Sequence, residues 1–139
     1  MDTKELEREI RRIVRVGKVS AVYPEKNAAR VVFEDKDNTV SAELRMLHRG
    51  AKRNKDFWLP DEGDEVVCIF SANDKQSEIG WIIGAHFNKE NPPQVKSADI
   101  MRIDFGDGGY IEYDRKNSAL NIHCPGTIRI TGGNIYLNE

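Results

Sequence analysis

The sequence predicts a mainly β protein, in which a short N-terminal helix is followed by a small barrel and then by a separate ladder of strands. Three observations indicate this fold class. Helical periodicity is confined to the first 15 residues, short β-rich runs separated by turn-forming residues fill the rest, and consecutive prolines at 92–93 divide those runs into two groups. We therefore expect four segments: a helix at 1–15, a barrel at 16–90, a linker at 91–98 and a strand ladder at 99–139.

The composition restricts the class of protein. The chain has 139 residues, of which 39% are hydrophobic and 32% charged, and its net charge is -2 at pH 7. A chain of this length buries one modest core, so a second module depends on partners. It contains no run of about 20 apolar residues that would span a membrane. The small negative charge gives no general attraction for phosphates, so we expect no nucleic-acid partner.

The first segment is expected to form an amphipathic helix. Asp2 or Thr3 is suited to cap it, and glutamates precede arginines along it, which matches the helix dipole. The stretch lacks the apolar core of a secretory signal, so we expect synthesis and residence in the cytoplasm. An apolar stripe with spacings of three and four needs a surface to pack against. Its residues are Leu6, Ile10, Ile13 and Val14.

The second segment is expected to form five short strands. They are separated by turn-forming residues and by a longer polar loop at 48–56. Closure of such strands into a small barrel of the OB type would remove their exposed edges. The expected strands are residues 16–22, 29–33, 39–44, 65–70 and 80–84.

The last segment alternates between apolar and polar residues, and its turns contain Gly, Asp, Asn and Pro. Strands are expected at 101–105, 109–113, 119–124, 127–131 and 134–137. The apolar residues of these strands share one face and are expected to pack in a core. They are Met101, Ile103, Phe105, Ile111, Tyr113, Leu120, Ile122, Cys124, Ile128, Ile130, Ile135 and Leu137.

A ladder of about 40 residues with one apolar face does not bury enough surface to be stable alone. Sister copies are the natural partners, because three ladders around an axis would cover each apolar face and pair the strand edges between chains. The pattern therefore favours a homotrimer with a stiff rod.

With these motifs the chain resembles the phage baseplate assembly protein V family, the spike proteins of contractile tails, which are related to the spike of type VI secretion. The likeness covers most of the chain. The matching segments are residues 16–22, 57–70, 80–87, 105–114 and 125–131.

The resemblance implies a structural spike without enzymatic activity. In that family a trimeric OB-fold docks onto tail hub and baseplate proteins, and a triple-stranded β-helix forms a needle that pierces the target cell envelope. The implied location is the baseplate of a virion or of a phage-tail-like particle such as a bacteriocin, with force supplied by sheath contraction.

Some members of the family hold an iron ion on the threefold axis through a His-x-His motif, which is absent from this sequence. His123 is the candidate metal ligand, but alternation directs it away from the apolar face, so we expect a surface histidine and no cofactor. An axial metal ion therefore lacks support from the sequence. Because the sequence ends at Glu139 directly after an expected strand, we also expect a blunt rod capped by a separate tip protein.

An alternative function is single-stranded nucleic-acid binding by the OB-fold. The basic loop 51–55, with Phe57, Trp58 and Trp81, matches a stacking surface of that kind. The apolar surroundings of both tryptophans favour core packing or contact between subunits instead. The acidic turn 61–65 is expected to be solvated, because catalytic carboxylates need a pocket and a partner base.

Two cysteines, Cys68 and Cys124, have neither metal-site nor redox-motif spacing. We expect both to be buried, reduced thiols.

Overall fold

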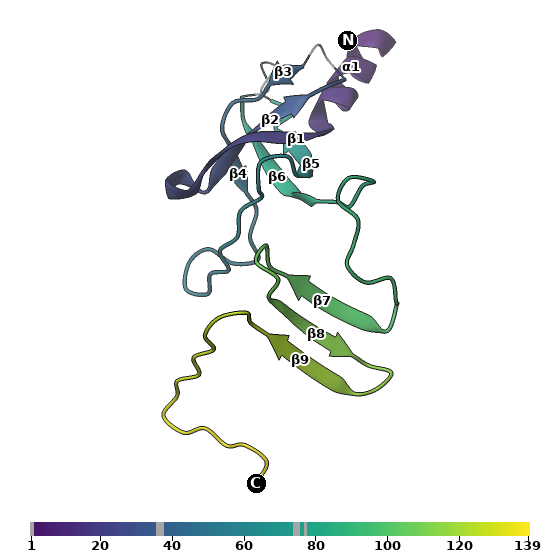
Figure 1. The fold of residues 1–139 in the computed structure, drawn as a ribbon. Coiled ribbons are helices and arrows are strands. Elements are labelled where there is room, and N and C mark those ends of the chain that lie inside the picture. The colour runs from purple at the N-terminus through teal and green to yellow at the C-terminus, as the bar shows by residue number, and fades with distance from the viewer. Residues whose placement is uncertain (1, 36–37, 74–75, 77) are drawn as a thin grey trace. The chain divides into compact units, whose positions relative to one another are not determined.

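The computed structural model describes residues 2–35, 38–73, 76 and 78–139. The chain divides into two compact units, Met1–Asn91 and Pro92–Glu139. The first unit contains a helix and a barrel, and the second contains a three-stranded sheet (Figure 1). The fold is therefore mainly β, as predicted. Within the described residues, no helix is long and apolar enough to span a membrane.

Helix α1 spans Thr3–Ile13 and confirms the predicted N-terminal helix. The Asp2 carboxylate caps it by accepting a hydrogen bond of 2.8 Å from the Glu5 backbone N–H. Acidic Glu5 lies in the first turn and basic Arg11 and Arg12 in the last, which suits the dipole. None of the helix residues is buried, although the helix leads directly into the first barrel strand.

The barrel is closed, which confirms the predicted architecture. Strand order is β1-β5-β6-β4-β2, and β1 also pairs with β2, so the five strands form a ring. The short β3 pairs with the end of β2, at Val32 and Phe33. All pairs are antiparallel except β4 with β6. The strands are β1 Val14–Tyr23, β2 Ala28–Phe33, β3 Thr39–Val40, β4 Leu44–Met46, β5 Glu65–Phe70 and β6 Gly80–Ala85.

The third predicted strand, 39–44, is interrupted in the structure. Its two ends belong to β3 and β4, and the ring is closed by β4. Ser41 accounts for the break: its hydroxyl accepts a hydrogen bond of 2.9 Å from the Val31 N–H, while its own N–H donates to the Val31 carbonyl. The side chain thus replaces a backbone partner in the ladder.

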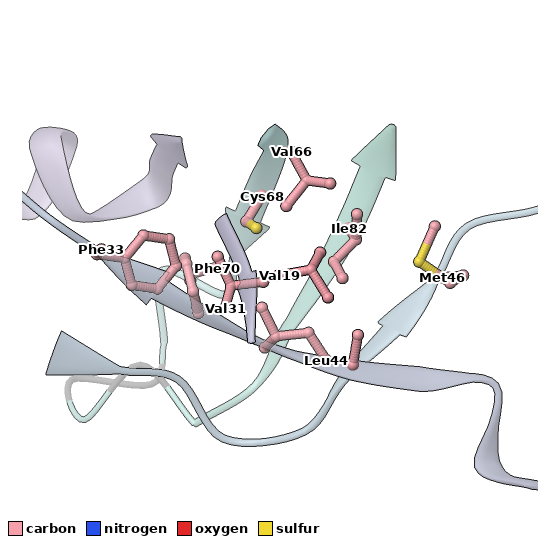
Figure 2. Packing of buried hydrophobic residues seen from close by; sticks show 10 residues of the cluster. Val19, Val31, Phe33, Leu44, Met46, Val66, Cys68, Phe70 and Ile82 are labelled. Atoms are coloured by element: carbon pink, nitrogen blue, oxygen red, sulfur yellow. The ribbon is translucent and has the colours of Figure 1, made fainter. Parts of the chain in front are cut away.

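Inward-facing residues of β1, β2, β4, β5 and β6 meet in the barrel core (Figure 2). Phe33 and Phe70 pack edge to face with ring centroids 5.8 Å apart. Gly17 leaves room for this packing, because a Cβ there would lie 2.5 Å from the Val32 carbonyl oxygen. The core residues are Val19, Ala29, Val31, Phe33, Leu44, Met46, Val66, Cys68, Phe70 and Ile82.

The second unit is an antiparallel meander of β7 Ile100–Asp104, β8 Tyr110–Asp114 and β9 Ala119–His123. Its first three predicted strands are present. The turn from β8 to β9 is stabilised by the Asp114 side chain, which accepts hydrogen bonds from Lys116 and Asn117.

The strands predicted at 127–131 and 134–137 do not form. Residues 124–139, all of which the structure describes, contain no strand, and from 125 onward every residue is exposed. An extended segment becomes a strand only when a neighbouring backbone takes up its hydrogen bonds. In the single chain these two segments have no such neighbour.

Candidate assembly interface

The meander carries an apolar face on which two rows of side chains cross all three strands. Directly opposed residues of an antiparallel pair point to the same side of the sheet, and the register therefore aligns the rows. These side chains are between 40% and 73% exposed, and Phe105 continues the face beyond β7. The rows are Met101–Tyr113–Leu120 and Ile103–Ile111–Ile122.

The opposite face of the meander is polar and internally bonded. Arg102 donates to Glu112 at 3.0 Å and to Asp104 at 2.9 Å, and Asn121 donates to the second Glu112 oxygen at 3.3 Å. Hydrogen bonds to Asp104 and Glu112 raise the pKa of Arg102 above its ordinary value. Polar side chains of this face therefore find partners within one chain, whereas the apolar face remains exposed.

His123 belongs to this polar face, because it pairs with Tyr110 and alternates with Ile122. Its ring stacks on Tyr110 with centroids 5.3 Å apart, and the Arg102 guanidinium lies 3.8 Å from the centre of the same Tyr110 ring. Among the residues that the structure describes, no group of three or more His, Cys, Asp or Glu side chains is arranged to hold a metal ion.

The remaining predicted needle-core residues lie in the extended segment 124–139. Ile128, Ile130, Ile135 and Leu137 are exposed there. Cys124 is only partly buried, with its thiol 3.5 Å from the Thr127 carbonyl oxygen, so the expectation of a buried thiol is wrong for the single chain. Cys68 is buried in the barrel as expected, and desolvation raises the pKa of Cys68 to about 12.

Three aromatic residues, Phe57, Trp58 and Trp81, were predicted to pack in the barrel or to contact other subunits, and they lie outside the barrel core. Phe57 is 71% exposed and lines a hollow of about 250 Å³ with His48 and Lys55. Trp58 is also solvent-accessible, and its carbonyl oxygen lies 3.5 Å from the Asn27 side-chain nitrogen. Trp81 is half-buried on the outer side of β6. Core packing therefore does not explain these side chains.

Comparison with known proteins supports the resemblance that the motifs indicate. The chain is 28% identical over 128 residues to the protein named "Spike protein" of Escherichia phage P2. It is similar to a phage spike protein. The aligned part covers 92% of this chain and 58% of that relative, so the chain spans less than two thirds of the relative's length. No family model matches the chain.

One apolar surface was not predicted from the sequence. In β1, β5 and β6 the residues that alternate with the core positions face outward, and most of them are also apolar. A nearly continuous apolar run such as 65–70 is the sequence signal for a strand covered on both faces. We call this surface the barrel wall; it consists of Val14, Val16, Val67, Ile69, Trp81 and Ile83.

Proposed function

We propose that this chain is the structural spike of a contractile tail, in which three copies form a rigid rod that pierces the envelope of a target cell. The observation that carries the proposal is the meander, with exposed apolar rows on one face and a hydrogen-bonded polar network on the other. Exposed apolar surface of this extent marks a site of protein association.

Association of three meanders would remove each apolar face from water, which is the main driving force for such contacts. It would also give backbone partners to the outer edges of β7 and β9. Residues 124–139 would become strands by pairing with sister chains, forming a triple-stranded β-helix. The alternation of Ile128, Ile130, Ile135 and Leu137 suits that role.

The mechanism is mechanical rather than catalytic. Bending a rod whose strands pair between chains requires many hydrogen bonds to break together, so the rod transmits load without buckling. Sheath contraction supplies the force, and the small cross-section concentrates it. The barrel docks onto tail hub and baseplate proteins, and a separate tip protein caps the rod. Synthesis takes place in the bacterial cytoplasm, before assembly into a virion or a phage-tail-like particle.

Light scattering tests the trimer directly. The wild-type chain is expected to have a mass three times 15.8 kDa, and Ile111→Asp is expected to be monomeric because it places a charge in the middle of the apolar face. Glu112→Gln, the neighbouring position on the polar face, serves as the matched control and is expected to remain trimeric. A monomeric wild-type protein at micromolar concentration would contradict the proposal.

A second candidate function, binding of single-stranded nucleic acid, is favoured by the exposed Phe57 ring next to the basic loop 51–55. It predicts that the wild-type chain retards a labelled oligonucleotide at low salt and that Phe57→Ala weakens this binding. The spike proposal predicts no retardation at any salt concentration.

A further inference from the structure

Besides the barrel wall, the first unit contains another apolar surface that its own chain leaves uncovered, and this surface lies on α1. Leu6 and Ile10 lie one helical turn apart on α1 and are 50% and 59% exposed. We call this pair the α1 stripe. The helix is held to its own barrel through Arg12, which donates to the Ala72 carbonyl at 3.3 Å, and this contact leaves the stripe exposed.

An isolated helix of 11 residues is only marginally stable in water. Most helices gain their stability by packing an amphipathic face, and α1 has such a face but buries none of its residues. A stable α1 therefore needs a second surface that covers the α1 stripe.

The barrel wall has the apolar character that such a helix needs. Two cross-strand rows build it, Val14–Ile69–Trp81 and Val16–Val67, with Ile83 beside them. The next row, Lys18–Glu65, is charged and ends the wall on one side. Figure 1 shows that α1 joins the barrel at β1, where the wall begins.

We propose that α1 of one copy packs its stripe on the barrel wall of the neighbouring copy, so that the barrels form a ring of head-to-tail contacts. The inference rests on the trimer proposed above and names the contact between its barrels. Each chain carries both halves of the contact, and a closed ring of three leaves neither half exposed.

The connector between the two units favours a second copy of the chain as the partner that covers the α1 stripe. Residues 86–99 connect β6 to β7 and span at most about 50 Å when fully extended. Meanders that associate therefore hold their barrels at an effective concentration on the order of millimolar. At that concentration even a modest apolar contact between barrels is populated.

The charges around the two surfaces are complementary. On a helix, Glu7 and Glu9 lie on either side of the α1 stripe, and of the two Glu9 is already paired with Arg12 of its own helix, at 2.6 Å. On the wall, exposed Arg45 is the register partner of Trp81. Within the described part of the chain, neither Glu7 nor Arg45 forms an ion pair. Opposite charges at the rim of an apolar contact fix its orientation.

Disulfide trapping in the full-length chain tests this contact. Ile10→Cys and Ile83→Cys are combined with Cys124→Ser, which removes the partly exposed native thiol. The protein is oxidised with diamide, which accepts the two hydrogens released by each disulfide.

A second pair, Leu6→Cys with Ile69→Cys, guards against unsuitable geometry at the first. Each pair is expected to give a covalently linked trimer on a non-reducing gel. Ile10→Cys with Ser20→Cys, an exposed residue outside the wall, is the matched control and should remain unlinked.

Three outcomes would overturn the inference. Dimers formed by Ile10→Cys alone mean that helices meet each other, a disulfide within one chain means that α1 covers its own wall, and no product from either pair means that the surfaces do not meet. The mass of the native protein, measured before oxidation, distinguishes a failure of this inference from a failure of the proposed function. A native trimer without linked product contradicts the helix contact alone, whereas a native monomer contradicts the trimer itself.

Discussion

The barrel and the meander have the same alternation of apolar and polar residues but reach different states in one chain. In the barrel, alternate residues of five strands meet in a closed ring and are removed from water. In the meander, the equivalent residues form two rows that remain exposed. Alternation therefore determines which face of a strand is apolar, whereas closure of the sheet determines whether one chain can cover that face.

A substitution in the closed barrel core is expected to change stability more than any substitution on the exposed face of the meander. Phe33→Ala is expected to lower the free energy of unfolding of the barrel by about 3–5 kcal/mol, because it leaves a cavity beside Phe70. Both tryptophans, Trp58 and Trp81, lie in the first unit, so their fluorescence during urea unfolding reports on the barrel.

Ile103→Ala is the matched substitution on the meander, measured in the monomeric Ile111→Asp background. It is expected to leave the fluorescence transition of the barrel unchanged, because Ile103 is exposed in the second unit. An equal loss for both substitutions would mean that the two regions unfold as one cooperative body.

A smaller effect tests how tightly the barrel is packed. Gly17→Ala is expected to cost about 1–3 kcal/mol, since the added Cβ would lie 2.5 Å from the Val32 carbonyl and 2.6 Å from the Val31 side chain. Gly84→Ala provides the control, because nothing lies within 4 Å of its Cβ position. Urea midpoints measure both, and a neutral Gly17→Ala would show that the ring relaxes more easily than a close-packed core.

Thiol reactivity distinguishes the two regions without disturbing either. Burial raises the pKa of Cys68 to about 12, so at pH 8 it remains a thiol and is expected not to react with Ellman's reagent. Cys124 is partly exposed and is expected to react in monomeric Ile111→Asp, giving one thiol per chain. If the wild-type chain forms the proposed trimer, the expected count is zero, and a fully reactive Cys124 would argue against the proposed place of this residue in a rod.

The smallest effect concerns a surface turn of the meander. Hydrogen bonds from the Asn117 side chain and from the Lys116 and Asn117 backbone lower the pKa of Asp114. A lowered folded-state pKa stabilises the turn above the unfolded value of about 3.9, and this contribution is lost as the pH falls through the lower folded value. NMR titration should show the Asp114 pKa rising toward its ordinary value in Asn117→Ala.

Much of this fold could be predicted from the sequence because the relevant signals are local. The spacing of Leu6 and Ile10 predicts α1, and the β-rich runs of the barrel predict strands that the structure confirms. The exception at Ser41 arises because a serine hydroxyl can replace a backbone partner, and this choice depends on the position of Val31 in another strand.

The candidate interface could be predicted only in part. The register confirms that Met101, Ile111 and Leu120 share a face with their neighbours, since side chains alternate along every strand. The barrel wall was not predicted, because a run such as 65–70 does not reveal which of its two apolar faces points into the barrel.

By itself, then, the sequence determined where the helix and most strands lie and which residues share a face, because backbone stereochemistry fixes these within a few residues. Only the tertiary structure decided that β1 pairs with β5 and β4 with β6 around the first core, and that residues 124–139 stay unpaired in one chain. The reason is that a strand needs a backbone partner, and an apolar face needs a covering surface. Both are supplied by parts of the molecule distant in sequence, or by another copy.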